Sequence, residues 1–192
     1  IAYMDAFKQN RPALRFLSGL WQNSDATPLS DADITRIAAD GTLEMRDMVA
    51  EYELDHGRIA NAQRVLASVA NGPWPDIRAI SARVADRLGN AATARTVVDQ
   101  VLADDETNYH ALLLSSQQNL RARRIDAAIN AAQIVIREYP DRQQGYLALL
   151  DAYAARDDDQ GLRRVFADAA NKLPQNLVLF TRYADYLIAK GE

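Results

Sequence analysis

The sequence contains no cysteine, which excludes disulfide bonds and thiolate metal sites. It has no run of about 18 apolar residues, so no segment is predicted to span a membrane. Only 8 glycines and 6 prolines occur among its 192 residues, too few for the many turns of a β-sandwich. These absences, together with abundant alanine, favour an all-α protein.

A surplus of basic residues is missing as well. The formal net charge is −4, whereas the electrostatic part of nucleic-acid binding depends on an excess of Lys and Arg, so we expect no nucleic-acid partner. Apolar residues make up 48% of the chain and charged residues 25%, which is the balance of a globular protein with a core. The absence of a free thiol fits the oxidising periplasm, with the cytoplasm as the alternative compartment.

Two prolines, Pro140 and Pro174, each close a helical pattern, and the spacing between them is 34 (174 − 140 = 34). We divide the chain into consecutive rows of 34 residues, one of which is 143–176. The first half of this row carries apolar residues with the i, i+3, i+4, i+7 spacing of one helical face, namely Tyr146, Leu149, Leu150 and Tyr153. A polar turn, DDDQG, follows at 157–161. The second half has helical spacing again, at Leu162, Val165, Phe166, Ala169 and Ala170.

The same plan continues along the chain in rows 109–142 and 177–192. Gly89 and Gly191 occupy the turn position three periods of 34 apart, and the spacing from Gly57 to Gly89 is 32 (89 − 57 = 32). Because isolated helices of about 14 residues are marginal in water, the pairs are expected to stack and bury their apolar stripes. Small residues should let neighbouring helices approach closely, namely Ala62, Ala94 and Ala128, with Phe166 filling the next layer.

At these positions the chain resembles the tetratricopeptide repeat (TPR) family. That family has a bulky residue at position 4, Leu and a small residue at 7 and 8, Tyr at 11, Ala at 20, an aromatic at 24, Ala at 27 and Pro at 32. Row 143–176 offers Tyr146, Leu149, Leu150, Tyr153, Leu162, Phe166, Ala169 and Pro174. Leu150 and Leu162 are larger than the family norm, and row 109–142 departs further, with Ser115, Ser116 and Asn119 at positions 7, 8 and 11. The resemblance implies an α-α superhelical solenoid of helix-turn-helix repeats.

The two ends fit the repeat less regularly. Residues 1–42 are predicted to form a divergent helical unit or cap, in which Pro12 opens a helix running to about Gln22. Ser30 with Asp33 resembles a capping box that opens a second, short helix ended by Gly41. Residues 43–192 hold the TPR-like repeats. The last repeat is incomplete, so we expect a fragment of a longer array, or a face covered by another chain.

The resemblance also implies a partner-binding surface, because in that family the first helices line a concave groove with positions 2, 5, 9, 12 and 13. Carried onto this chain, these positions give Glu44, Asp47, Glu51, Asp55, Arg83, Arg87, His110, Gln117, Arg121, Gln144 and Asp151, with Asp76, Asp86 and Asp185 on the same faces. The alternatives are a solvated acidic face and local pairing of the arginines with nearby acids. The Asn-and-Lys clamp by which some cochaperone TPR domains hold a terminal carboxylate is missing.

No constellation for catalysis or cofactor binding is present in the sequence. His56 lies at a helix end and His110 near a helix start, in different units, so neither is predicted to bind a metal or to act in catalysis. A Gly-rich phosphate loop, a nucleophile elbow and an HExxH motif are all absent. Trp21 and Trp74 are predicted to be packing residues. Trp74 would fill the shortened connection NGPWP, and an exposed aromatic anchor for a partner is the alternative there. We therefore expect a non-enzymatic protein without a cofactor.

The function predicted from these observations is a protein–protein interaction scaffold whose groove binds a segment of a partner in a larger complex. Similar arrays occur in bacterial secretion and in exopolysaccharide and cellulose export systems, where they recruit partners in the periplasm. One alternative is a structural spacer or a module that self-associates through the uncovered C-terminal helix. Another is a solenoid arm attached to an envelope enzyme.

Overall fold

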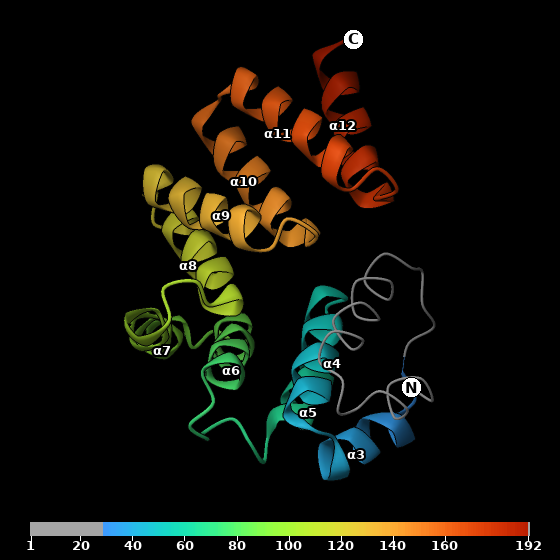
Figure 1. The fold of residues 1–192 in the computed structure, drawn as a ribbon, viewed down its shortest axis with the longest axis vertical. Helices are drawn as coiled ribbons and strands as arrows, with labels where there is room; N and C mark the ends of the chain where they lie inside the picture. Colours follow the sequence, from blue (N-terminus) through green and yellow to red (C-terminus); the bar gives the residue numbers. More distant parts are fainter. Residues whose placement is uncertain (1–28, 192) are drawn as a thin grey trace. The chain divides into compact units, whose positions relative to one another are not determined.

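The computed structural model describes residues 29–191, and within this range it contains ten α-helices and no β-strand. In chain order these are α3 (Asp31–Asp40), α4 (Leu43–Asp55), α5 (Ile59–Leu66), α6 (Pro75–Arg87), α7 (Ala91–Asp104), α8 (Tyr109–Arg121), α9 (Ile125–Glu138), α10 (Gln143–Arg156), α11 (Asp159–Lys172) and α12 (Leu177–Lys190) (Figure 1). The prediction of an all-α protein is confirmed for this part of the chain. None of these helices is long and apolar enough to cross a lipid bilayer.

Backbone contacts divide the chain into two compact units, Ile1–Ala111 and Leu112–Glu192. In the first unit α4 packs against α5 and α6, and α6 packs against α7 (Figure 1). In the second unit α10 packs against both α9 and α11, and α11 packs against α12. Helices that are neighbours in sequence are thus neighbours in space, as a helical repeat requires. The predicted boundary at residue 42 divides the chain by repeat register and stays a prediction.

The turn inside each helix pair has the same backbone geometry at every occurrence. A residue with positive φ follows the first helix of the pair, at Gly57 (74°), Gly89 (91°), Arg123 (59°), Asp157 (59°) and Gly191 (76°). The successive spacings between these turns are 32, 34, 34 and 34. At the first four turns the next amide donates to the carbonyl five residues earlier at 2.8 to 3.0 Å, as in a Schellman motif. The predicted turn positions of Gly57, Gly89 and Gly191 are confirmed.

Because two of these turns lack glycine, we expect Arg123→Gly and Asp157→Gly each to raise the free energy of unfolding. The left-handed conformation costs a residue with a Cβ roughly 1 to 2 kcal/mol, while the added freedom of glycine in the unfolded chain offsets about half of that. Urea unfolding followed by circular dichroism should show a gain of about 0.5–1 kcal/mol for each variant. Gly89→Ala is the mirror control and should lose about 1 kcal/mol. A lower free energy of unfolding for both Arg123→Gly and Asp157→Gly would contradict the shared turn geometry.

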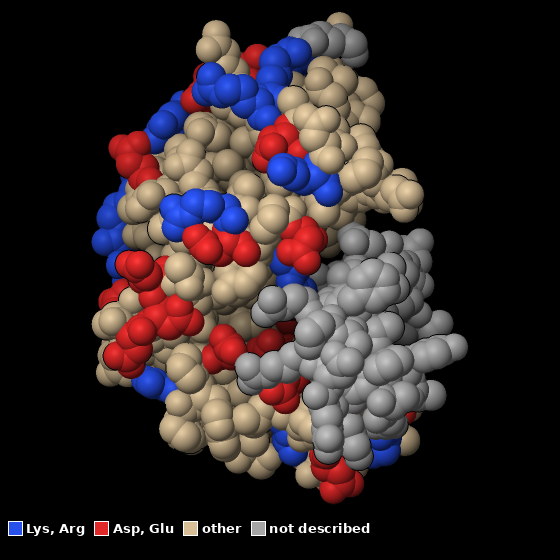
Figure 2. All heavy atoms as spheres, in the orientation of Figure 1, with Lys and Arg blue, Asp and Glu red and all other residues tan. Residues whose placement is uncertain are grey.

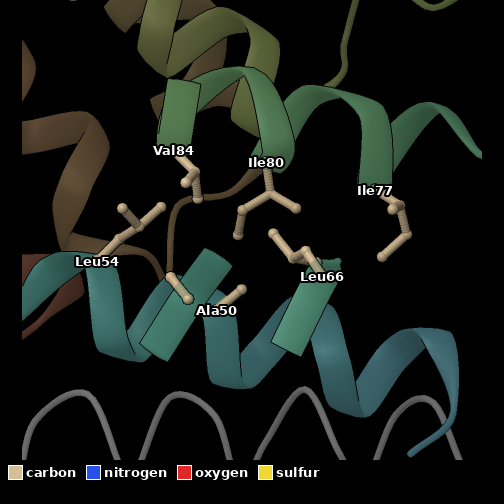
Figure 3. Close-up of a cluster of buried hydrophobic side chains, with 7 residues drawn as sticks. Ala50, Leu54, Leu66, Ile77, Ile80 and Val84 are labelled. Atoms are coloured by element: carbon tan, nitrogen blue, oxygen red, sulfur yellow. The ribbon is translucent and has the colours of Figure 1, made fainter. Parts of the chain in front are cut away.

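The core of the first unit consists of two clusters of buried apolar side chains. One joins α3, α4 and α5 and contains Ile34, Ile37, Met45, Met48, Val49 and Val65. The other joins α4, α5 and α6, where the side chains of the facing helices point toward one another (Figure 3), and contains Ala50, Leu54, Ala62, Leu66, Ile77, Ile80 and Val84. The small residues expected to permit close helix approach, Ala62, Ala94 and Ala128, are all 0% exposed.

The predicted helix start at Ser30 and the predicted helix end at Gly41 are confirmed. Ser30 Oγ accepts a hydrogen bond from Asp33 N (3.1 Å) and opens α3, which ends before Gly41. The predicted helix after Pro12 and the packing role of Trp21 lie outside the described residues.

Trp74 is 41% exposed and lies so close to Gly72 that a Cβ there would overlap its ring. Trp74 therefore covers the short connection instead of entering the core.

In the second unit, the carboxylate of Asp159 at the start of α11 interacts with two side chains of α12, Tyr186 and Lys190. Its carboxylate accepts hydrogen bonds from the Tyr186 hydroxyl and from Arg163 Nε (3.1 Å), and Lys190 Nζ lies 2.9 Å away. The hydrogen bond from Tyr186, followed by those from Lys190 and Arg163, holds the pKa of Asp159 well below its usual value. The carboxylate is therefore more stable as an anion in the folded state than in the unfolded chain.

This shift predicts that Asp159→Asn loses less stability than the wild type when the pH is lowered. A carboxylate whose pKa is depressed by folding stabilises the native state above its unfolded pKa of about 3.9, and the contribution disappears as the pH falls toward the folded value. Urea midpoints of both chains at about pH 6 and about pH 3 measure the effect. The gap between the two midpoints should shrink at the lower pH, and a gap that stays constant would contradict the assignment.

Candidate partner-binding surface

The predicted binding residues of the first unit lie on the first helices of its pairs. Asp47, Glu51 and Asp55 recur every fourth residue along α4, so their carboxylates share one helical face. Thr42 caps the start of α4, because its Oγ1 accepts a hydrogen bond from Met45 N at 3.3 Å. This face of α4 turns toward α6 and the beginning of α8.

Five of the predicted residues form one cluster of charged and polar side chains, Asp47, Glu51, Asp55, Arg83 and His110. Arg83 Nη2 donates to Asp55 Oδ1 at 3.2 Å, and Arg83 Nη1 lies 4.0 Å from Glu51 Oε1. Arg83 Nη1 also lies 2.9 Å from His110 Nδ1, while His110 Nε2 lies 2.9 Å from Asp47 Oδ1. Glu51, Arg83 and His110 are buried. We call this group the α4–α6–α8 ion cluster.

The guanidinium of Arg83 is held in its charged form inside the protein. Burial alone lowers the pKa of Arg83, but the neighbouring carboxylates, chiefly Asp55 and then Glu51, outweigh it, and the pKa is raised. A buried cation of this kind is stable only while its carboxylate partners remain in place. Arg83 therefore links α6 to α4 by electrostatic attraction in a region of low dielectric constant.

The contacts of His110 determine which ring nitrogen carries its proton. A guanidinium can only donate hydrogen bonds, so the Nδ1 atom that faces Arg83 must accept one. The proton therefore lies on Nε2, which faces Asp47 Oδ1. His110 thus accepts from Arg83 of α6 through Nδ1. Its Nε2 lies beside Asp47 Oδ1 of α4, a buried oxygen that accepts no hydrogen bond in the described chain.

The remaining predicted residues of the first unit lie outside the ion cluster. Glu44 is half-buried in the first turn of α4, and Arg87 is exposed at the end of α6. Asp86 is buried, whereas Asp76 accepts a hydrogen bond from Asn108 Nδ2 at 2.8 Å. The other histidine, His56, ends α4 and places Nδ1 2.8 Å from the carbonyl of Tyr52, as expected for a histidine at a helix C-terminus.

In the second unit the predicted residues are more accessible. Gln117 and Arg121 are exposed on α8, while Gln144 and Asp151 on α10 are half-buried. Asp151 forms an ion pair with Arg182 of α12, which joins successive first helices. A partner could reach Gln117 and Arg121 without disturbing the core, whereas binding through Glu51 or Arg83 would require these side chains to leave the ion cluster.

Sequence reasoning missed two asparagines that join successive helix pairs. Asn108 Oδ1 accepts from Ala111 N (3.2 Å), so the residue caps α8, while its Nδ2 donates to Asp76 of the preceding first helix. Asn176 does the same for α12, accepting from Leu179 N (3.0 Å) and donating to Gln143 Oε1 (2.9 Å). The two asparagines are two periods apart (176 − 108 = 68), and this spacing was the available signal.

The polar residues that depart from the TPR pattern in row 109–142 form hydrogen bonds within the second unit. Ser116 is buried and donates from Oγ to the carbonyl of Ala128 at 2.9 Å, which ties α8 to α9. Asn119 Nδ2 donates to Ser115 Oγ at 3.3 Å. Hydrogen bonds at these positions therefore take the place of the apolar contacts that the family pattern has there.

Acidic and basic side chains lie interspersed over much of the face in Figure 2. Within residues 29–191, no group of three or more His, Asp or Glu side chains is arranged to hold a metal ion. Neither a protein-family model nor a curated protein matches the chain.

Proposed function

We propose that the chain is a non-enzymatic scaffold for protein–protein interaction. Its helix pairs would form an α-α superhelical solenoid of the TPR type that presents the polar faces of the first helices to an extended segment or a helix of a partner. The observation that supports this proposal is the constant geometry of the turns, which recur at spacings of 32, 34, 34 and 34. A scaffold built from repeated pairs offers equivalent side-chain positions in successive repeats, which suits recognition of an elongated partner.

The accessible residues suit a partner that carries both charged and amide groups. On α8, Gln117 supplies an amide group and Arg121 a positive charge. The ion pair of Asp151 with Arg182 adds one carboxylate and one guanidinium. Arginine binds carboxylates in a bidentate geometry, so an acidic side chain of the partner is a suitable ligand for Arg121. Binding by this surface involves no covalent step and no cofactor.

The proposed setting is the periplasm, in a bacterial exopolysaccharide or cellulose export or secretion apparatus. It is supported by the resemblance to TPR arrays that recruit partners in such systems, and by the absence of cysteine, which fits an oxidising compartment. The cytoplasm is the alternative. Fractionation of cells that express the protein separates the two compartments.

Site-specific photocrosslinking tests the binding surface. A benzoylphenylalanine residue replaces Gln117 on α8 in one chain, and Gln63 on α5 in the matched control, because both glutamines are exposed. After irradiation in the source bacterium, we expect a protein adduct from position 117 and none from position 63, with mass spectrometry identifying the partner. Equal crosslinking from both positions, or none from position 117, would count against the proposal.

A second candidate function is self-association through α12. This helix exposes four large apolar side chains, Leu177 (74%), Val178 (48%), Phe180 (41%) and Ile188 (73%). Exposed apolar clusters of this kind are typical of interfaces. Sedimentation equilibrium of the chain and of Leu177→Lys measures this: a dimer abolished by the substitution supports self-association, and a strict monomer at high concentration excludes it.

A further inference from the structure

A cavity of about 250 Å³ lies in the second unit between α9, α10 and α11. Its floor is apolar and consists of Ile136, Tyr146, Leu149, Tyr153 and Val165. The polar part of the lining consists of two arginines, Arg137 and Arg164, together with Gln133 and Asp168. Small-molecule sites usually measure roughly 300 to 1,000 Å³, so this cavity suits a single large side chain better than a whole free ligand.

The cavity depends on a glycine at the beginning of α11. A Cβ on Gly161 would lie 2.6 Å from Cδ1 of Tyr153, so any larger residue would push this ring away from α11. One period earlier the corresponding residue is Ala127 (161 − 34 = 127). The absence of a side chain at Gly161 therefore lets the Tyr153 ring lie against the α11 backbone and form one wall of the cavity.

The charged groups at the cavity differ in whether they already have partners. The Tyr146 hydroxyl donates to the carbonyl of Pro140 at 3.3 Å, and the Asp168 carboxylate lies near the same hydroxyl. Burial, reinforced by Asp168, raises the pKa of Tyr146 to about 12, so this hydroxyl stays neutral. Arg137 pairs with Glu138 at 2.7 Å. Within residues 29–191, Arg164 has neither a hydrogen bond nor an ion pair.

This cavity is distinct from the predicted groove. Gln144 and Asp151, the groove residues of α10, each lie two positions from a cavity residue, Tyr146 and Leu149 respectively. Two residues correspond to about 200° around an α-helix, so the two sets occupy nearly opposite faces of α10. An occupant of the cavity would therefore not compete with a ligand of the groove.

We propose that the cavity binds one phenylalanine or leucine side chain of a segment of another protein, and that an adjacent Glu or Asp of that segment pairs with Arg164. The apolar floor would bury the ring or the branched chain, which supplies most of the affinity. The carboxylate would satisfy the guanidinium that has no partner in the described chain, which supplies the selectivity.

The test uses two capped dipeptides as probes, acetyl-Phe-Glu-amide and acetyl-Phe-Gln-amide, titrated into the whole chain and followed by two-dimensional NMR of the backbone amides. We expect the glutamate probe to shift the amides of Gly161, Arg164 and Val165, with a dissociation constant of about 1–10 mM, as suits a single anchoring side chain. The glutamine probe should bind about fivefold more weakly, because it lacks the charge-assisted contact with Arg164. Acetyl-Ala-Glu-amide should not shift these amides.

Arg164→Gln should abolish the preference for the glutamate probe while leaving the weaker binding of the glutamine probe unchanged. Arg95→Gln, which removes the same charge from α7 of the first unit, is the matched control and should retain the preference. Equal affinity of the two probes for the wild type, or a preference that survives Arg164→Gln, would overturn the proposal. Amide shifts confined to other residues, or no binding up to about 20 mM, would also overturn the proposal. Tighter binding of hexanoate than of the glutamate dipeptide would overturn it as well and would assign the cavity to an acyl chain.

Discussion

Replacing Arg83 with methionine is expected to lower the free energy of unfolding by about 3–5 kcal/mol, the usual cost of removing one partner of a buried ion pair. The substitution keeps most of the side-chain volume but leaves the carboxylates of Asp55 and Glu51 without the guanidinium between them. It also leaves His110 Nδ1 without its donor. The cost arises mainly from carboxylates that lose their cation in a poorly solvated place, and only secondarily from the lost hydrogen bonds.

Chemical denaturation of the whole chain measures this effect, with Arg87→Met as the matched control. Arg87 lies on the same helix but is exposed, so its replacement should change the free energy of unfolding by about 0.5 kcal/mol or less. Similar effects of the two substitutions would mean that the ion cluster contributes no more than a surface pair. A less stable Arg87→Met chain would contradict the burial pattern itself.

Replacing Arg46 with methionine is expected to cost about 3 kcal/mol, the second-largest effect that the structure predicts. This buried guanidinium donates from Nε to Gly41 O (2.8 Å), from Nη1 to Val65 O (2.9 Å) and Ser68 Oγ (3.1 Å), and from Nη2 to Ala39 O (3.3 Å). Burial lowers its pKa, and the attraction of Asp40 only partly compensates. Methionine would fill the space but leave these oxygens without a donor.

Urea unfolding is again the measurement. The control is Arg36→Met, at an exposed position of α3, with an expected change of about 0.5 kcal/mol or less. Hydrogen exchange gives a more specific readout, because Arg46 joins the ends of α3 and α5 to α4. The amides at the end of α5 should exchange faster in Arg46→Met than in the wild type. Unchanged protection there, even with a lower overall stability, would contradict the proposed joining role.

The repeat register was readable from the sequence because it depends on local chemistry. Glycine at positions 57, 89 and 191 marks turns that need a positive φ, and Ser30 marks a helix start by hydrogen bonding within one turn. The equivalent turns at Arg123 and Asp157 were located by counting from the glycines, since arginine does not favour a left-handed conformation and aspartate adopts it only occasionally.

The candidate surface was readable only in part. The sequence placed Glu51, Arg83 and His110 on the first helices, but the structure shows that they are buried and in contact with one another. Arg46 had no sequence signal, because most of its acceptors are backbone carbonyls, which every residue possesses. The proposed role of Arg164 as a ligand for a carboxylate likewise depends on the open cavity that residues of α9, α10 and α11 line.

Helix positions, turn positions and the all-α class follow from the periodicity of apolar residues and from helix capping. Both depend on residues that are close together in the sequence, so both can be recognised without the tertiary structure. Which charged side chains become buried and which stay available to a partner was settled by the packing of α4, α6 and α8 and of α9, α10 and α11. Burial and ion pairing join residues that are distant in the chain, as Arg83 and Asp55 are (83 − 55 = 28). Such contacts depend on how whole helices stack, so a one-dimensional pattern contains the candidates but not their environment.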